Sequence, residues 1–188
     1  MRNIPLKSIT GFTLTEILIA LVIVVFVVMG AGSAHIGAHN FFTSIKQHSQ
    51  VQEEVKIALE HITKNIQSGI GDLNNPAFTI SGGNQLDVRI DTNNDGKFTA
   101  ADRTIRYTYS GAPNYRIVYD PDTNIAGNES NITDKLISAV SYNSGSGSAS
   151  NEIEITIEAL MDPTKSEAID NPKASLTSTA AIKGMSCR

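Results

Sequence analysis

Hydrophobic and polar positions divide the chain into an apolar segment and a polar remainder. Residues 17–34 form an uninterrupted run of 18 residues without a charge, most of them Ile, Leu, Val, Ala and Phe. A helix of this length is about long enough to cross the hydrocarbon core of a bilayer. From Asp72 onward the chain carries 15 acidic and 10 basic residues. The pattern predicts a membrane-length helix followed by a body that belongs in water.

The helical pattern continues beyond the apolar run, but with one apolar face. Apolar side chains recur mostly at spacings of three or four residues, with charged and amide side chains between them: Phe41, Ile45, Val51, Val55, Leu59, Ile62 and Ile66. This spacing predicts one continuous amphipathic helix from about Thr13 to Ser68. We expect the helix to end at Gly69 or Gly71 in a left-handed cap. The remaining chain must cover the apolar face of this helix beyond the membrane-length run.

The C-terminal part of the chain has the two-residue alternation of β-strands. Alternating side chains predict strands at 86–90, 105–109, 115–119, 135–142, 153–157 and 176–182. The Gly/Ser-rich residues 143–150 predict an exposed hairpin tip. Short strands joined by turns favour an antiparallel sheet whose apolar face needs the helix as a cover. The predicted fold class is therefore α+β, a long N-terminal helix packed on an antiparallel β-sheet head.

Composition narrows the classes of function. With 40% hydrophobic and 18% charged residues the chain is too apolar for a disordered protein, and its net charge of -4 disfavours nucleic acid as a partner. The single cysteine, Cys187, excludes a disulfide within the chain; we interpret it by default as an exposed free thiol, with burial or pairing with another chain as the alternatives. No catalytic motif is present, so we expect no enzyme. Four histidines on the helix lack convergent spacing, and we interpret them as solvated or interfacial: His35, His39, His48 and His61.

Charges at the N-terminal edge of the apolar run indicate its orientation. Arg2 and Lys7 precede the run, which favours a cytoplasmic N-terminus and a body on the other side of the membrane. Glu16 lies inside the edge of the run, where an unpaired carboxylate is costly and therefore rare. Two alternatives remain open: residues 31–34 as the cleavage site of a secretory signal, or Glu16 as a tolerated charge on an ordinary membrane anchor.

The segment Gly11-Phe12-Thr13-Leu14-Thr15-Glu16, behind a short basic leader and before an unbroken apolar helix, resembles the signal of type IV prepilins and type II secretion pseudopilins. The resemblance implies that a prepilin peptidase cuts between Gly11 and Phe12 and that Phe12 becomes N-methylated. It also implies that Glu16 meets the N-terminal amine of a neighbouring subunit in the filament. Opposite buried charges that pair escape much of the cost of burying either alone.

The helix departs from the family in one respect. Many members carry a proline about two-thirds along the membrane helix, whereas this chain has no proline between Pro5 and Pro76. Gly30, Gly32 and Gly37 lie in that neighbourhood instead, and each lowers helix stability by about 1 kcal/mol relative to alanine. These glycines either melt the helix locally or permit close packing between membrane helices.

The order of features in the head resembles, more weakly, the J-type minor pseudopilins and the W-type minor pilins. The shared features are a helix with Ala58-Leu59-Glu60 and Ile66, followed by strands at 105–107, 115–116 and 176–178. The resemblance implies a leader at 1–11, a transmembrane or filament-core helix at 12–37, an amphipathic helix at 38–70 and a β-rich head at 71–188.

The function implied by this resemblance is that of a minor pilin or pseudopilin, a structural subunit in filament initiation, assembly or tip formation. The expected partners are other pilin or pseudopilin subunits, the prepilin peptidase, the inner-membrane assembly platform and, before assembly, the membrane itself. The expected location is the bacterial inner membrane, crossed once with the head in the periplasm or outside, and then the pilus or pseudopilus.

Residues 91–102 fit the twelve-residue calcium loop of EF-hand and dockerin type. Gly96 supplies the sharp turn, and the expected ligands are Asp91, Asn93, Asp95, the Lys97 carbonyl, Thr99 and Asp102. Because the loop ends in aspartate rather than glutamate, we expect weak affinity, roughly 10⁻⁴ to 10⁻³ M. The alternative is a polar hairpin turn. A bound calcium ion would favour a second function, a calcium-dependent adhesin or substrate-recognition head displayed on the filament.

Overall fold

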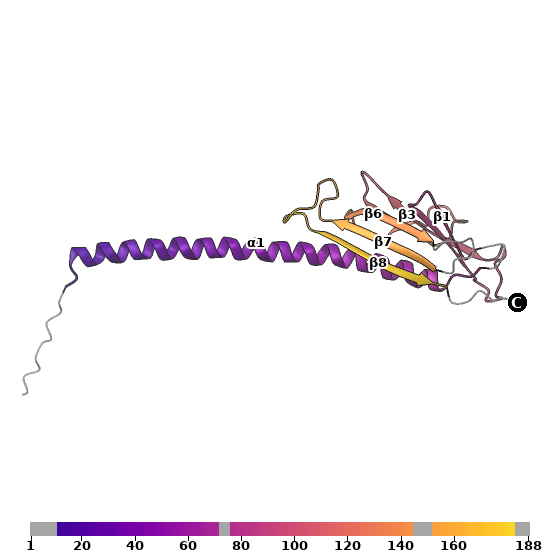
Figure 1. The fold of residues 1–188 in the computed structure, drawn as a ribbon, viewed down its shortest axis with the longest axis horizontal. Coiled ribbons are helices and arrows are strands. Elements are labelled where there is room, and N and C mark those ends of the chain that lie inside the picture. Colours follow the sequence, from indigo (N-terminus) through magenta and orange to yellow (C-terminus); the bar gives the residue numbers. More distant parts are fainter. Residues whose placement is uncertain (1–10, 72–75, 145–151, 183–188) are drawn as a thin grey trace, which may run out of the picture. The chain divides into compact units, whose positions relative to one another are not determined.

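The computed structural model describes residues 11–71, 76–144 and 152–182 (Figure 1). These residues form one α-helix followed by eight β-strands, which confirms the predicted α+β layout. The elements are α1 (Leu14–Gln67), β1 (Phe78–Ser81), β2 (Gln85–Ile90), β3 (Arg103–Ser110), β4 (Arg116–Asp120), β5 (Ser130–Asn131), β6 (Ile137–Ser144), β7 (Glu152–Leu160) and β8 (Lys173–Ala181).

The helix α1 confirms the prediction of one continuous helix. The chain divides into two compact units, residues 1–43 and residues 44–188. In the first unit the large apolar side chains of the helix are exposed, from 45% at Val22 to 81% at Leu14. By length and composition, α1 contains a stretch that is able to cross a membrane.

In the second unit, one stripe of α1 packs against the strands. Five helix residues are completely buried and belong to one core cluster with residues of both sheets: Val51, Val55, Ala58, Ile62 and Ile66. Phe41 and Ile45, which the periodicity places on the same stripe, are exposed. Burial of a Val or Ile side chain stabilises by about 1.5–3 kcal/mol, so the residues from Val51 onward hold the helix to the head.

The strands form two antiparallel sheets, so the prediction of a single sheet is wrong. Sheet A has the order β1-β2-β3-β4-β5, and sheet B has the order β6-β7-β8, whose strands lie side by side in Figure 1. The alternation of side chains fixes which face of a strand is buried, but it does not fix which strands pair. The short strands β1 and β5 were not predicted, because four and two residues give too little alternation.

The helix ends at Gln67, but the predicted left-handed glycine cap is wrong. Neither Gly69 nor Gly71 has a positive φ. Gly69 forms an isolated bridge with Ile90, and a Cβ atom at Gly69 would lie 3.1 Å from Val88 Cγ1. Close approach of the backbone to β2, rather than a left-handed conformation, therefore favours glycine at this position, because a Cβ atom would need Val88 to shift by a few tenths of an ångström.

The hairpin predicted around residues 143–150 is confirmed by its two strands, because β6 and β7 pair antiparallel from Ser144 and Ile153. Residues 145–151 of its tip lie outside the described residues. The same holds for residues 1–10 of the predicted leader and for Cys187.

Candidate functional site

The start of α1 brings Thr13 and Glu16 together. The Thr13 amide donates a hydrogen bond of 2.9 Å to Glu16 Oε2, and the Glu16 amide donates one of 3.3 Å to Thr13 Oγ1. This reciprocal pair is a capping box, which satisfies backbone donors that the first turn of a helix leaves free. The sequence argument missed this role of Glu16, although threonine followed three residues later by glutamate is its signature.

The capping box also provides local partners for the Glu16 carboxylate. The Thr13 hydroxyl donates a second hydrogen bond of 2.9 Å to Glu16 Oε2. Phe12, where we expect the mature chain to begin, directly precedes this pair and is 85% exposed. Gly11 is exposed as well. The expected cleavage site and the assembly glutamate therefore lie at one exposed helix start.

Loop 91–102 joins β2 to β3 and is closed by hydrogen bonds to its own backbone. Asp91 Oδ2 accepts from the Gly96 amide at 2.8 Å, and Asp95 Oδ1 accepts from the Lys97 amide at 2.8 Å. Asn93 Oδ1 accepts from the Asp95 amide at 3.0 Å. Gly96 has a φ of 77°, as the sharp turn expected there requires.

Asp102 ties the end of this loop to its beginning. The side chain is 5% exposed, and Oδ1 accepts from the Thr92 amide at 2.9 Å while Oδ2 accepts from the Thr99 amide at 2.6 Å. The hydrogen bond from the Thr92 amide, helped by that from Thr99, lowers the pKa of the Asp102 carboxyl. Phe98 is half-buried, with the Arg89 guanidinium 5.2 Å from its ring centroid.

The donor chemistry of the loop suits calcium, because all of the expected ligands are hard oxygen atoms. Asp91 Oδ1 is buried without a hydrogen-bond partner, which is the state of an atom that a cation would satisfy. Among the described residues, however, no group of three or more His, Cys, Asp or Glu side chains converges as a metal site. The Asp95 and Asp102 carboxylates are instead engaged with the loop, so calcium binding remains an expectation.

A polar cluster lies between α1 and sheet A. The Tyr107 hydroxyl accepts a hydrogen bond of 2.6 Å from Asn65 Nδ2 and lies 2.9 Å from His61 Nδ1. The His61 ring also contacts Tyr119, with centroids 4.8 Å apart. Burial, together with the nearby charge of Lys64, lowers the pKa of His61. His61 is therefore interfacial, between helix and sheet, whereas the other three histidines are exposed.

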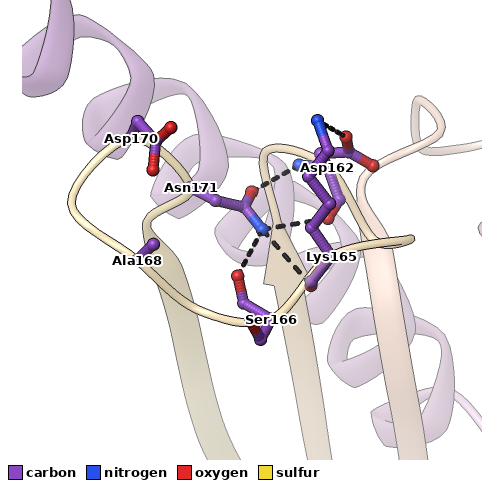
Figure 2. A pocket seen from close by; sticks show the side chains of 6 residues that line it. All are labelled: Asp162, Lys165, Ser166, Ala168, Asp170 and Asn171. Atoms are coloured by element: carbon purple, nitrogen blue, oxygen red, sulfur yellow. Dashed lines mark hydrogen bonds and ion pairs between the residues drawn. The ribbon is translucent and has the colours of Figure 1, made fainter.

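The loop between β7 and β8 is built around Asn171, which is 4% exposed (Figure 2). Asn171 Oδ1 accepts from the Asp162 amide at 2.6 Å, and Nδ2 donates to the carbonyls of Asp162, Lys165 and Ser166 at 3.0–3.3 Å. A cavity of about 370 Å³ adjoins it, lined by Asp162, Lys165, Ser166, Ala168, Asp170 and Asn171. The hydrogen bond from Lys165 lowers the pKa of Asp162 to about 2. The sequence argument missed this loop, although its Asp-Pro and Asn-Pro pairs indicate turns.

The largest exposed apolar surface of the described chain belongs to the first half of α1. The large apolar side chains between Ile17 and Met29 are 45–70% exposed. Contiguous apolar surface of this extent marks a site of contact with membrane or protein. Comparison of the chain with family models, curated proteins and solved structures finds no match. The candidate site is therefore described from this chain alone. It consists of the apolar surface of the first half of α1 and the Thr13–Glu16 pair at the start of that helix.

Proposed function

We propose that the chain is a structural subunit of a type IV pilus or a type II secretion pseudopilus, in a minor role of filament initiation, assembly or tip formation. One observation carries the proposal: the first half of α1 exposes its apolar side chains, and a carboxylate, Glu16, lies at the start of that surface. A bilayer, or a bundle of like helices, buries such a surface at a gain of about 25 cal/mol per Å².

In the proposed sequence of events, the first half of α1 crosses the inner membrane once and leaves the head in the periplasm. A prepilin peptidase cuts after Gly11 and the new N-terminus at Phe12 is methylated. The assembly platform then extracts the subunit, and α1 packs in the filament core. There the Glu16 carboxylate pairs with the N-terminal ammonium of a neighbouring subunit, which offsets the cost of burying either charge.

The proposal is tested by the N-terminus of the mature protein and by its presence in filaments. Mass spectrometry is expected to find a chain that begins at N-methylated Phe12, and sheared filaments are expected to contain it. Substitution Gly11→Leu is expected to leave the leader attached and to keep the chain in the membrane. A mature chain that begins near residue 35 would identify an ordinary secretory signal and contradict the proposal.

A second candidate function is a calcium-dependent adhesin or substrate-recognition head carried on the same filament. The unpartnered Asp91 Oδ1 in loop 91–102 favours it. Asp91, Asn93, Asp95, Thr99, Asp102 and the Lys97 carbonyl would hold the ion. Calcium there would join the end of β2 to the start of β3 and stabilise a head that has no disulfide to do so. This candidate depends on calcium binding, for which the Discussion gives a direct test.

A further inference from the structure

Two arginines on neighbouring strands of sheet A have opposite environments. Arg106 on β3 donates through Nε and Nη2 to the two oxygens of Asp87, at 2.7 and 2.9 Å. Arg116 on β4 is half-buried, and its Nε is buried without a hydrogen-bond partner. Within residues 11–71, 76–144 and 152–182, the Arg116 side chain has neither a hydrogen bond nor an ion pair.

The strand register explains why Arg116 has no acidic neighbour. Ile117 is completely buried, so Arg116, Val118 and Asp120 alternate onto the opposite, outer face of sheet A. Asp120 is four residues away, about 13 Å along the strand, and it lies opposite Arg106. Ser110, which is opposite Arg116, is neutral and accepts a hydrogen bond from Asn114. The carboxylates of this face thus gather around Arg106.

An unsatisfied guanidinium donor in a half-buried position is unfavourable. Arginine stays charged, and a desolvated donor without an acceptor loses the hydrogen bonds that it would make to water. Its planar fork matches a carboxylate, which it binds through two parallel hydrogen bonds. Arg116 lies on a strand face, while the cavity described above is lined by the β7–β8 loop. Such a face suits a carboxylate presented by another protein surface.

We propose that Arg116 is an intersubunit contact that receives a carboxylate from the head of the adjacent filament subunit. The inference rests on the proposed filament function. The composition of the head favours such a pairing, because a neighbour like this one offers 15 acidic residues against 10 basic ones after residue 71. Arginine is also among the residues that contribute most to protein interfaces.

The test compares Arg116→Gln and Arg116→Lys with Arg103→Gln in the full chain. Arg103 is exposed on β3, so its replacement removes the same charge from a solvated position. The measured quantity is the amount of chain in sheared filaments relative to the membrane fraction. Arg116→Gln is expected to lower this ratio about tenfold, which corresponds to about 1.4 kcal/mol. Arg116→Lys is expected to restore part of it, and Arg103→Gln to leave it unchanged.

The melting temperature of each purified variant in detergent separates assembly from folding. Arg116→Gln is expected to melt at or above the wild-type temperature, because it removes an unpaired charge. If Arg116→Gln gives the same ratio of filament to membrane protein as the wild type, the intersubunit contact is overturned, but the proposed filament function is not. If Arg116→Gln melts at a lower temperature than both the wild type and Arg103→Gln, then Arg116 has a stabilising partner within its own chain. Stabilisation of the wild type by millimolar sulfate that Arg116→Gln abolishes would reveal an inorganic anion site. Either finding overturns the proposal, and absence of the wild-type chain from filaments overturns the proposed function with it.

Discussion

Thr13 and Glu16 cap the first turn of α1 for each other, with the Thr13 amide 2.9 Å from Glu16 Oε2. Glu16 therefore combines two properties that a single alanine substitution would remove together. One is the acceptor oxygen that closes the capping box, and the other is the negative charge at the edge of an apolar segment. Glutamine keeps the acceptor and removes the charge, so it separates these two properties.

For Glu16, we expect both Glu16→Ala and Glu16→Gln to lower incorporation into filaments while membrane insertion stays the same or improves. Removal of the charge lowers the cost of insertion but deletes the partner of the neighbour's Phe12 ammonium. Glu16→Ala also loses the side-chain acceptor that closes the capping box, which weakens the start of the helix. Cross-linking of each variant to filament subunits measures the effect. Normal assembly of Glu16→Gln would show that Glu16 acts only as a cap.

For loop 91–102, we expect the full chain in detergent to melt at a higher temperature as calcium rises through the millimolar range. A ligand that binds only the folded state stabilises it by about 2.7 kcal/mol at 100 times its dissociation constant. Magnesium is expected to do much less, because it retains its waters and demands octahedral geometry.

Two substitutions make the calcium test specific to the loop. Asp95→Ala is expected to abolish the response to calcium, whereas Asp170→Ala, which removes one charge from the exposed β7–β8 loop, is expected to leave it intact. A melting curve that calcium does not move would mean that loop 91–102 is a hairpin held by its own hydrogen bonds alone.

For the β7–β8 loop, we expect Asn171→Ala to lower the free energy of unfolding by about 2–3 kcal/mol, because the buried Asn171 side chain loses all four of its hydrogen bonds to the loop backbone. Asn171→Asp is expected to be at least as harmful near pH 7, since it places a carboxylate oxygen against the three carbonyls that Nδ2 now serves. Denaturant unfolding measures both variants. Asn124→Ala, at an exposed loop position, is the control and should change stability by less than about 0.5 kcal/mol. An unchanged midpoint for Asn171→Ala would show that other contacts hold the loop.

For His61, we expect stability to fall in acid. Its pKa in the folded chain lies below the ordinary value of 6.5, so the unfolded chain binds the proton more readily. The contribution of neutral His61 is complete above pH 6.5 and is lost as the pH falls through the lower, folded value. The groups that face the ring are Tyr107, Tyr119 and Lys64, and among the described residues no carboxylate lies beside it to favour the charged form.

The His61 effect is measured as the change in melting temperature between pH 7.5 and pH 5.5. His61→Gln retains a group that hydrogen-bonds the Tyr107 hydroxyl but does not titrate, so its melting temperature should fall less than that of the wild type. Burial raises the pKa of Glu54, which acts in the opposite direction but is common to both proteins and cancels. Parallel curves for the two proteins would show that protonation of His61 does not affect stability.

Two parts of the fold follow from the sequence because they depend on local periodicity. The apolar run and the three- and four-residue spacing predict a helix over about 13–68, and α1 covers Leu14–Gln67. Two-residue alternation likewise locates the six longer strands, with Ile153, Ile155 and Ile157 facing the core. The turn at Gly96 is also local, since it requires a positive φ.

The sequence by itself thus determined the helix, the six longer strands and the apolar first half of the helix with Glu16 at its start. Only the tertiary structure decided what depends on contacts between distant residues. Strand pairing divided the head into two sheets, and packing against β2 favoured glycine at Gly69 without a left-handed cap. Register gave Arg106 a partner and left Arg116 without one. Periodicity records which face of an element is buried, but the neighbour on that face is chosen by the free energy of the whole packed chain.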